Sequence, residues 1–413
     1  MGTPLTRSFS AFIPTSLLRR RHSQGSHREL RPSPVAAMAA GSKEMRNPAT
    51  RLTDDLIVEI LSRLPVKSLC RFRCVSKLWR GLISHPDHRK KLPQTLAGFF
   101  YHTTSRERFP ESARHFTNVT GWGEPLIRPS LSFLPGHIDI LDCCNGLLLC
   151  RSQTAASASQ YIVCNPATEE WAALPESSQA GNICNARLGF DPAVSPHFHV
   201  FEFVEADDDI FVRGLEVYSS LTGEWIYRNS GWSVELILRD NSSTVFINGF
   251  LNVFEPGFFK QNVFAPADQH VLAGDTEGNT WRTIRVPPGH HDGLIGQSQG
   301  RLYYLNVLEE HDFKLTVFVL EDYSSDEWIF KHSVMASELL GTSFDLIQYY
   351  YPIAFHPECH LIYFVSYVDN TIRCYDMDHR KVHVIHNMGC KLDRWECCLP
   401  YVPLFSESLA GWN

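Results

Sequence analysis

The chain has 413 residues, of which 44% are apolar and 20% charged, a composition typical of a globular protein with two or three domains. A formal net charge of -7 argues against nucleic-acid binding, which favours basic surfaces. No apolar run approaches the roughly 20 residues of a membrane-spanning helix, so the sequence predicts no membrane-spanning segment.

Residues 1–50 are rich in Arg and Ser, with eight Lys or Arg residues against two acids, Glu29 and Glu44. We interpret them as a disordered basic leader. An organelle transit peptide has the same composition, and Met38 could be the true start, which would make the leader an upstream extension. These alternatives stay open.

The twelve cysteines include the adjacent pairs Cys143–Cys144 and Cys397–Cys398 but no Cys-x-x-Cys. This pattern has neither the spacing of a zinc site nor that of a disulfide framework. It favours reduced, mostly buried thiols, and therefore a location in the cytoplasm, the nucleus or both.

The first predicted folded unit spans residues 51–90. Its opening apolar residues recur at spacings of three and four, as on one face of an amphipathic helix: Leu56, Ile57, Ile60, Leu61 and Leu64. Thr53 is expected to cap this helix and Pro65 to end it. Two further short helices are predicted over Lys67–Arg73 and Val75–Ile83.

Three helices in about 35 residues are too few to stabilise a core of their own. The first helix also carries apolar residues around more of its circumference than packing in so small a unit requires. Either the three helices pack on the domain that follows, or they present an apolar surface to a partner.

The segment resembles an F-box of the type common in plants. The similar stretches are "LTDDL" at Leu52–Leu56, "EILSRLPVKSL" at Glu59–Leu69 and "RFRCVSKLW" at Arg71–Trp79. Thr53 departs from the proline usual in the family. Because Thr suits the position before a helix, we expect the fold to survive and partner affinity to change little.

The resemblance implies that this unit docks onto a Skp1-type adaptor, which joins it to cullin and RING subunits. By position, the residues expected in that contact are Leu52, Leu56, Ile60, Leu64, Pro65, Val66, Leu69, Val75 and Trp79. Some of them must also hold the three helices together, and the sequence does not separate the two roles.

Beyond Phe99 the chain changes to short apolar runs, and one pattern recurs. Four copies end in a tryptophan: Trp171, Trp225, Trp281 and Trp328. Six residues before each stands a small polar residue: Asn165, Ser219, Asp275 and Asp322. A fifth copy keeps Asp376 but has Val382 in place of the tryptophan.

This pattern predicts a small antiparallel sheet of about four strands per copy. The apolar run before the polar residue is a strand, and Asn, Asp or Ser begins the tight turn that follows. The tryptophan begins the return strand, where its large surface can seal the gap between neighbouring units. Several copies are preceded by a second turn: Asn145-Gly146, Asn248-Gly249 and Gln299-Gly300.

All-strand repeats of about this length predict a β-propeller over residues 97–413. Five copies plus one from 97–135 give six blades, with seven as an alternative. The run "CCLPYVPLF" near the carboxyl end is expected to supply the strand that closes the ring. The predicted class is therefore α+β multidomain, a small three-helix unit followed by an all-β propeller. A β-sandwich is the competing fold.

This region resembles the F-box-associated, kelch-like β-propeller domain of plant proteins. The resemblance rests on "CCNGLLLC" at Cys143–Cys150, "YIVCNPATEEWAALP" at Tyr161–Pro175 and "LGFDP" at Leu188–Pro192. Neither the Gly-Gly of kelch repeats nor the Trp-Asp of WD40 repeats occurs in the chain.

The chain has no phosphate-binding Gly-rich loop and no His-Glu-x-x-His. One Gly-x-Ser-x-Gly match occurs, GQSQG at Gly296–Gly300, but it includes the predicted Gln299-Gly300 turn between two strands, whereas a hydrolase places this motif at a strand-to-helix turn. The nearest approach to a metal cluster is the run "FHPECH": His356, Cys359 and His360. We interpret it as a turn before a strand, where neighbouring side chains point to opposite faces. His290-His291 indicates a solvated loop, and Glu205–Asp209 a hairpin tip or, alternatively, an acidic rim for a basic partner. The sequence predicts no catalytic residue, metal or cofactor.

The favoured function is that of an interaction protein: the substrate-recognition subunit of an SCF-type (Skp1-cullin-F-box) ubiquitin ligase, which marks a target for proteasomal degradation. The resemblance implies this role, in which the protein acts by proximity and not by bond chemistry. The alternatives are a Skp1-binding scaffold outside any ligase and a propeller enzyme. The sequence identifies neither the target nor the residues that bind it.

Overall fold

The computed structural model describes residues 52–64, 68, 72, 76–84, 88, 96–103, 113–121, 123–153, 159–178, 185–205, 211–229, 236, 238, 242–255, 269–289, 293–309, 313–340, 350–389 and 398–404.

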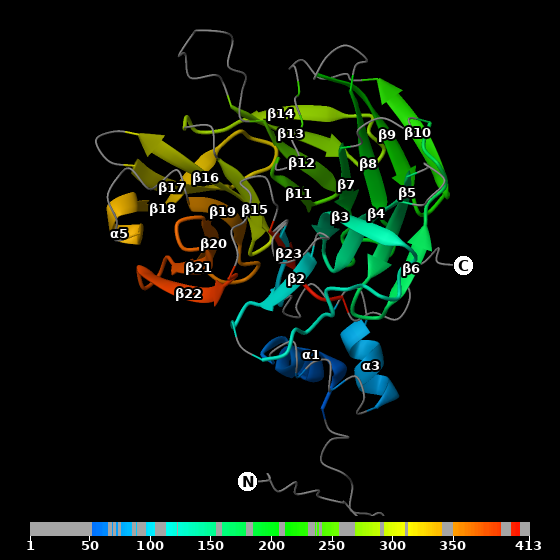
Figure 1. Ribbon diagram of the computed structural model, residues 1–413, viewed down its shortest axis with the longest axis horizontal. Helices are drawn as coiled ribbons and strands as arrows, with labels where there is room; N and C mark the ends of the chain where they lie inside the picture. Colours follow the sequence, from blue (N-terminus) through cyan, green and yellow to red (C-terminus); the bar gives the residue numbers. More distant parts are fainter. Residues whose placement is uncertain are drawn as a thin grey trace, which may run out of the picture. The chain divides into compact units, whose positions relative to one another are not determined.

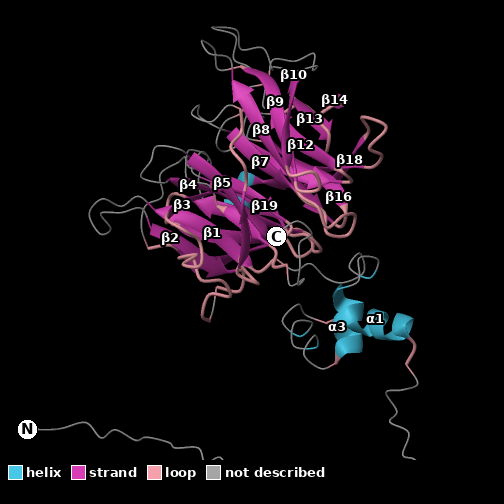
Figure 2. Ribbon diagram, turned by 90° about the vertical axis from the view of Figure 1, so that its right-hand side faces the viewer, coloured by secondary structure: helices cyan, strands magenta, loops and turns pink. Residues whose placement is uncertain are grey.

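Two helices, α1 (Asp54–Ser62) and α3 (Lys77–Ser84), contact each other ahead of the strands (Figure 2). The predicted middle helix, Lys67–Arg73, falls outside the described residues except for Ser68 and Phe72, which are both helical. No helix among the described residues is long and apolar enough to cross a membrane.

The ends of the helices differ from the prediction. Thr53 occupies the N-cap position of α1, but its side chain makes no capping hydrogen bond; only its carbonyl oxygen accepts one, from the Ile57 amide at 3.0 Å. The helix ends at Ser62 and not at the residue before Pro65. In α3 the cap is Ser76, whose Oγ accepts a hydrogen bond from the Trp79 amide at 3.2 Å.

The remaining described chain forms six antiparallel sheets arranged as the blades of a propeller (Figure 1). Five blades have four strands in chain order. They are blade 1, with β3 (His137–Cys144), β4 (Leu147–Gln153), β5 (Ser159–Asn165) and β6 (Glu170–Ala173); blade 2, with β7 (Asn185–Gly189), β8 (His199–Glu205), β9 (Val212–Ser219) and β10 (Glu224–Asn229); blade 3, with β11 (Thr244–Ile247), β12 (Phe250–Glu255), β13 (His270–Asp275) and β14 (Trp281–Arg285); blade 4, with β15 (Leu294–Ser298), β16 (Arg301–Glu309), β17 (Phe313–Leu320) and β18 (Trp328–Met335); and blade 5, with β19 (Tyr350–Phe355), β20 (Leu361–Ser366), β21 (Thr371–Asp376) and β22 (Lys381–Asn387). A short helix, α5 (Ala336–Leu340), follows β18.

The sixth, closing blade joins the two ends of the strand region. It contains β1 (Gly98–Thr103), β2 (Ala113–Asn118) and β23 (Leu399–Tyr401), in the order β2-β1-β23. Gly98 pairs with Tyr401, and the Ala97 amide donates to the Tyr401 carbonyl at 2.9 Å. Six blades, one of them with two strands from the 97–135 region, and closure by the carboxyl-terminal run are thus confirmed.

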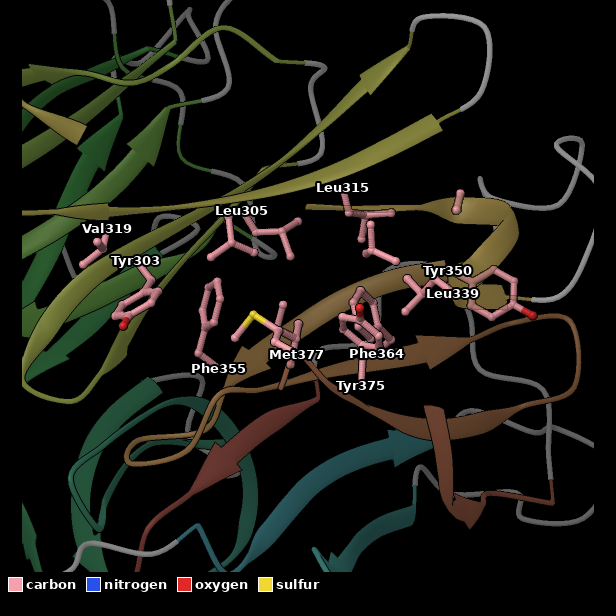
Figure 3. Close-up of a cluster of buried hydrophobic side chains, with 14 residues drawn as sticks. Tyr303, Leu305, Leu315, Val319, Leu339, Tyr350, Phe355, Phe364, Tyr375 and Met377 are labelled. Atoms are coloured by element: carbon pink, nitrogen blue, oxygen red, sulfur yellow. The ribbon is translucent and has the colours of Figure 1, made fainter. Parts of the chain in front are cut away.

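The core is divided among the junctions between blades. The first strands of blades 1 to 5 and β23 of the closing blade contact one another around the ring, and a separate cluster of buried apolar side chains lies at each of the six junctions. Figure 3 shows the cluster between blades 4 and 5, where Tyr303 and Leu305 face Phe355 and Tyr375. Each blade is therefore covered on both faces by its neighbours.

The predicted turns are present. Both residues of Asn145-Gly146, Asn248-Gly249 and Gln299-Gly300 have positive φ, as two-residue hairpin turns of the type I′ class require. In the outer turns, the polar residue that begins the repeat accepts a hydrogen bond from the amide two residues later, as Asn165 does from Ala167 at 3.0 Å and Asp322 from Ser324 at 2.8 Å.

The described cysteines are free thiols: Cys143, Cys144, Cys150, Cys164, Cys359, Cys374 and Cys398. Burial raises the pKa of Cys374 to about 12, so that this thiol stays protonated at neutral pH. The described thiols agree with the predicted reduced state.

Asn165 offers a test of ring closure. Its side chain is fully buried, and its Nδ2 donates to the Leu404 carbonyl at 2.9 Å, just beyond the closing strand. Asn165→Ala is expected to lower the free energy of unfolding by about 1–3 kcal/mol, because it leaves a buried carbonyl without its donor. Ser219→Ala, at the same place in blade 2, is the control, since the Ser219 Oγ accepts only from its own turn, from Leu221 at 3.3 Å. Equal losses in denaturant titrations would contradict this role.

Candidate functional site

The two sides of α1 differ in burial. Ile57, Val58 and Leu61 are buried and pack with Leu82 and Ile83 of α3. On the other side, Leu56 and Ile60 are exposed, with exposed fractions of 51% and 45%. Leu52, two residues ahead of the helix, is 40% exposed. We call these three residues, each four positions from the next, the outer stripe.

Burial distinguishes which of the residues predicted for partner contact also pack within the helical unit; the contact itself stays a prediction. Of the residues predicted for partner contact, the stripe residues are free of the helical core, whereas Leu64 and Trp79 are partly buried against it. The Trp79 ring lies 5.0 Å from that of Phe72. Pro65, Val66, Leu69 and Val75 lie outside the described residues.

Leu78 is a further exposed apolar residue of the helical unit that the predicted contact set omits. Its exposed fraction is 54%, although it lies on α3 beside the partly buried Trp79. Its place among the apolar residues of the predicted helix Val75–Ile83 was the available signal. Acidic side chains flank the stripe on α1, and Glu59 forms an exposed ion pair with Arg63 at 2.6 Å.

The repeated tryptophans begin the outer strands, as predicted, and two of them link neighbouring blades. Trp225 Nε1 donates to the Pro175 carbonyl at 2.8 Å, and Trp328 Nε1 to the Arg285 carbonyl at 2.9 Å. In each case the acceptor lies in the chain at or after the outer strand of the preceding blade.

The other two tryptophans of the repeat behave differently. Trp281 packs so closely over Gly274 that a Cβ there would lie 2.5 Å from its ring, and its Nε1 donates to its own turn at Gly278. Trp171 is 39% exposed. The preceding blade is in this case the closing blade, which has three strands in the part of the chain that the structure describes.

The run "FHPECH" has a structural role at His356. The amides of Glu358 and Cys359 both donate to His356 Nδ1 at 3.1 Å. Burial lowers the pKa of His356 to about 4, so the ring is neutral and able to accept these bonds at neutral pH. Among the described residues, no group of three or more side chains is placed to hold a metal ion.

Glu202 and Glu216 form a pair of buried carboxyl groups on adjacent strands of blade 2. Tyr161 of blade 1 donates to Glu202 at 3.1 Å, and the amide and hydroxyl of Ser178 donate to Glu216 at 3.0 Å. Burial raises the pKa of Glu216, with a further contribution from the Glu202 carboxylate. With both side chains covered, the pair joins two blades and is closed to a substrate.

Two cavities lie at blade junctions among the described residues. The first, of about 630 Å³, lies between blades 3 and 4 and is lined by His270, Thr283, Arg285, Val286, Pro287, Pro288, Asp326 and Trp328. The second, of about 390 Å³, is lined by residues 126–128, 131–133 and 166–169. The predicted loop residues His290 and His291, and Asp207–Asp209 of the acidic run, lie outside the described residues.

Comparisons with known proteins agree with this architecture. A family model described as "F-box protein At3g26010-like, beta-propeller" matches residues 126–403, and the F-box domain model matches residues 50–91. Two relatives are from Arabidopsis thaliana. F-box protein At5g07610 is 29% identical over 71% of this chain and 73% of its own length, and F-box protein At5g49610 is 25% identical over 67% and 76%.

Solved structures are similar to this chain only at a low level. TolB from Acinetobacter baumannii is 9% identical with a TM-score of 0.45, over 80% of this chain and 73% of its own. A chain of the nidogen/laminin complex is 9% identical with a TM-score of 0.41, over 73% and 97%.

The carboxyl pair predicts a pH dependence of stability. Because the pKa of Glu216 is raised in the folded protein, stability falls as the pH rises through the range above the usual carboxyl pKa. Glu202→Gln removes the neighbouring charge. The melting temperature of the variant should therefore be higher than that of the wild type at about pH 8, and the difference between the two melting temperatures should shrink towards about pH 4. The exposed Glu224→Gln is the control; a Glu202→Gln protein that melts like it at both pH values would contradict the repulsion.

Proposed function

This chain belongs to the family of F-box proteins with an At3g26010-like β-propeller, and from that premise we propose that it is the substrate-recognition subunit of an SCF-type ubiquitin ligase. The helical unit binds a Skp1-type adaptor, which connects it to cullin and RING subunits. The propeller binds a target protein, and ubiquitin transfer then directs the target to the proteasome.

The outer stripe is the observation that carries the proposal. Leu52, Leu56 and Ile60 remain exposed although α1 has its own buried face. Contiguous apolar side chains left in water mark surfaces that another protein covers. A partner that covers them gains the free energy of removing this area from water.

The role requires no bond chemistry from this chain, and the family supports a non-enzymatic adaptor. A receptor that holds the target beside the conjugating enzyme raises its effective concentration there. The cytoplasm, the nucleus or both are the proposed location, since the ligase and its targets meet there and the described thiols are free.

A second candidate is a Skp1-binding scaffold that acts outside any ligase. The same outer stripe supports it, since adaptor binding is common to both roles. Cullin association separates the two: immunoprecipitates of the tagged chain contain cullin if it acts in a ligase, and contain adaptor without cullin if it is such a scaffold.

The double variant Leu56→Asp/Ile60→Asp tests adaptor binding. We expect it to lower co-purification of a co-expressed Skp1-type adaptor by at least about tenfold, because two charges would be buried unpaired in the interface. Its circular dichroism and melting temperature should stay those of the wild type, since both positions are exposed.

Leu221→Asp is the matched control, because Leu221 is an apolar residue that is 68% exposed on the propeller. It should leave adaptor recovery unchanged. Equal adaptor recovery by the wild type and the double variant would refute the proposal.

A further inference from the structure

Among the described residues the closing blade has three strands where each other blade has four, and an irregular segment, residues 123–136, lies beside β2. Side chains of β2 hold it. Asn118 Nδ2 donates to the Glu124 carbonyl at 2.9 Å and Asn118 Oδ1 accepts from the Leu126 amide at 3.0 Å, while Arg114 Nη2 donates to the Ser130 carbonyl at 3.3 Å. The segment thus runs antiparallel to β2, as a fourth strand would, but is held by side chains. We call residues 123–136 the cover segment.

The cover segment fills the junction between the closing blade and blade 1 only in part. Ile127, Leu131 and Leu134 are buried there with Phe116 of β2 and Cys164 of β5. Between this segment and the turn at Pro166–Glu169 remains the cavity of about 390 Å³. That volume lies within the range of about 300–1,000 Å³ typical of ligand pockets.

Six of the ten residues that line this cavity are apolar, while polar groups supply the larger part of its accessible wall, and the cavity is partly open to water. The apolar lining residues are Leu126, Ile127, Leu131, Phe133, Pro166 and Ala167. Leu126 is 48% exposed. Trp171 lies at the same junction, since it pairs across the strands with Cys164, and it too is exposed. In blades 2 and 4 the corresponding tryptophan meets the chain at or after the outer strand of the preceding blade. For Trp171, the described residues of the closing blade include no such strand.

Each wall of the cavity also carries one exposed charge. Arg128 lies on the cover segment and Glu169 on the turn of blade 1. Within the described parts of the chain, neither side chain has an ion pair or a hydrogen bond. Two opposite charges on facing walls, with apolar surface between them, are complementary to an apolar side chain flanked by two charges of opposite sign.

The backbone at this cavity adopts conformations that cost stability. Leu131 is buried with φ of 47° and Glu169 has φ of 61°, in the left-handed region that bulky side chains disfavour. At the same position of the outer turn, four residues after the polar residue, blade 2 has Gly223 and blade 5 has Arg380 with φ of 53°, so the left-handed residue recurs in this turn. The buried Leu131 has no such counterpart, and its strained backbone at the cavity motivates a functional interpretation.

Resting on the proposed function, we infer that this cavity binds an extended segment of the target protein. The segment inserts an apolar side chain between the cover segment and the turn at Pro166–Glu169. On one side of that residue an acidic side chain pairs with Arg128, and on the other a basic side chain pairs with Glu169. The junction between the closing blade and blade 1 is then the place where the propeller selects its target.

The test is selection of a phage-displayed library of short random peptides on the purified full chain. The expected result is enrichment of an apolar residue between an acidic and a basic one. A fluorescent synthetic copy of the enriched peptide is then titrated with the protein, and binding is measured by anisotropy. Ala167→Trp, which fills the cavity, should weaken binding of this peptide at least about tenfold. Leu221→Trp, at the equivalent turn position of blade 2, should leave it unchanged.

Two charge variants keep the test informative should Ala167→Trp disturb the fold. Glu169→Gly should raise the melting temperature, because it relieves the left-handed glutamate, and should abolish the preference for the basic residue. Arg128→Glu should exchange the acidic preference for a basic one. A merely structural role for these side chains would not change which peptides are selected.

The inference is overturned if no such peptide is enriched, if Ala167→Trp and Leu221→Trp bind it equally, or if the charge variants select the wild-type motif. The measurement needs no adaptor, so its outcome is independent of the proposed function. A chain that binds the adaptor but selects no cavity-dependent peptide contradicts this inference alone. A chain that selects the motif but never binds the adaptor contradicts the proposed function alone.

Discussion

Removal of apolar surface from water stabilises both parts of this protein, the propeller and the helical unit. The two parts differ in how much of that surface the chain covers by itself. In the propeller it largely succeeds: pairing of β1 with β23 closes the ring, and each of the six junctions holds a buried apolar cluster to which both neighbouring blades contribute. In the helical unit it does not. One side of α1 covers itself against α3, and Leu56 and Ile60 on the other side remain in water. The uncovered side is the reason to expect a protein partner.

The propeller was predictable because its signals are local and repeated. A polar residue that accepts the amide two positions later makes its turn without help from the rest of the fold, so Asn165 and Asp322 could be recognised in the sequence. The Asn-Gly turns need only positive φ at two residues. Trp225 and Trp328 were predicted to seal the gap between neighbouring units. The structure adds that each ring Nε1 donates a hydrogen bond to a backbone carbonyl of the preceding blade or of the chain just after it.

Features that depend on tertiary neighbours were not predictable. Periodicity identified α1 as a helix, but Ile57 and Ile60 look alike in the sequence, and only packing against α3 shows that the first is buried and the second exposed. Thr53 has the right chemistry for a cap and makes no capping bond with its side chain. The cover segment has no repeat signal, since it replaces a backbone ladder with bonds from the side chains of Asn118 and Arg114.

The central claim is that another protein covers the exposed side of α1. Hydrogen exchange followed by mass spectrometry, on the full chain with and without a purified Skp1-type adaptor, tests it most directly. The account predicts that amides of residues 52–64 become protected when the adaptor is added, while those of the strands in blades 1–5 exchange as before. Unchanged exchange over residues 52–64 at saturating adaptor would contradict it.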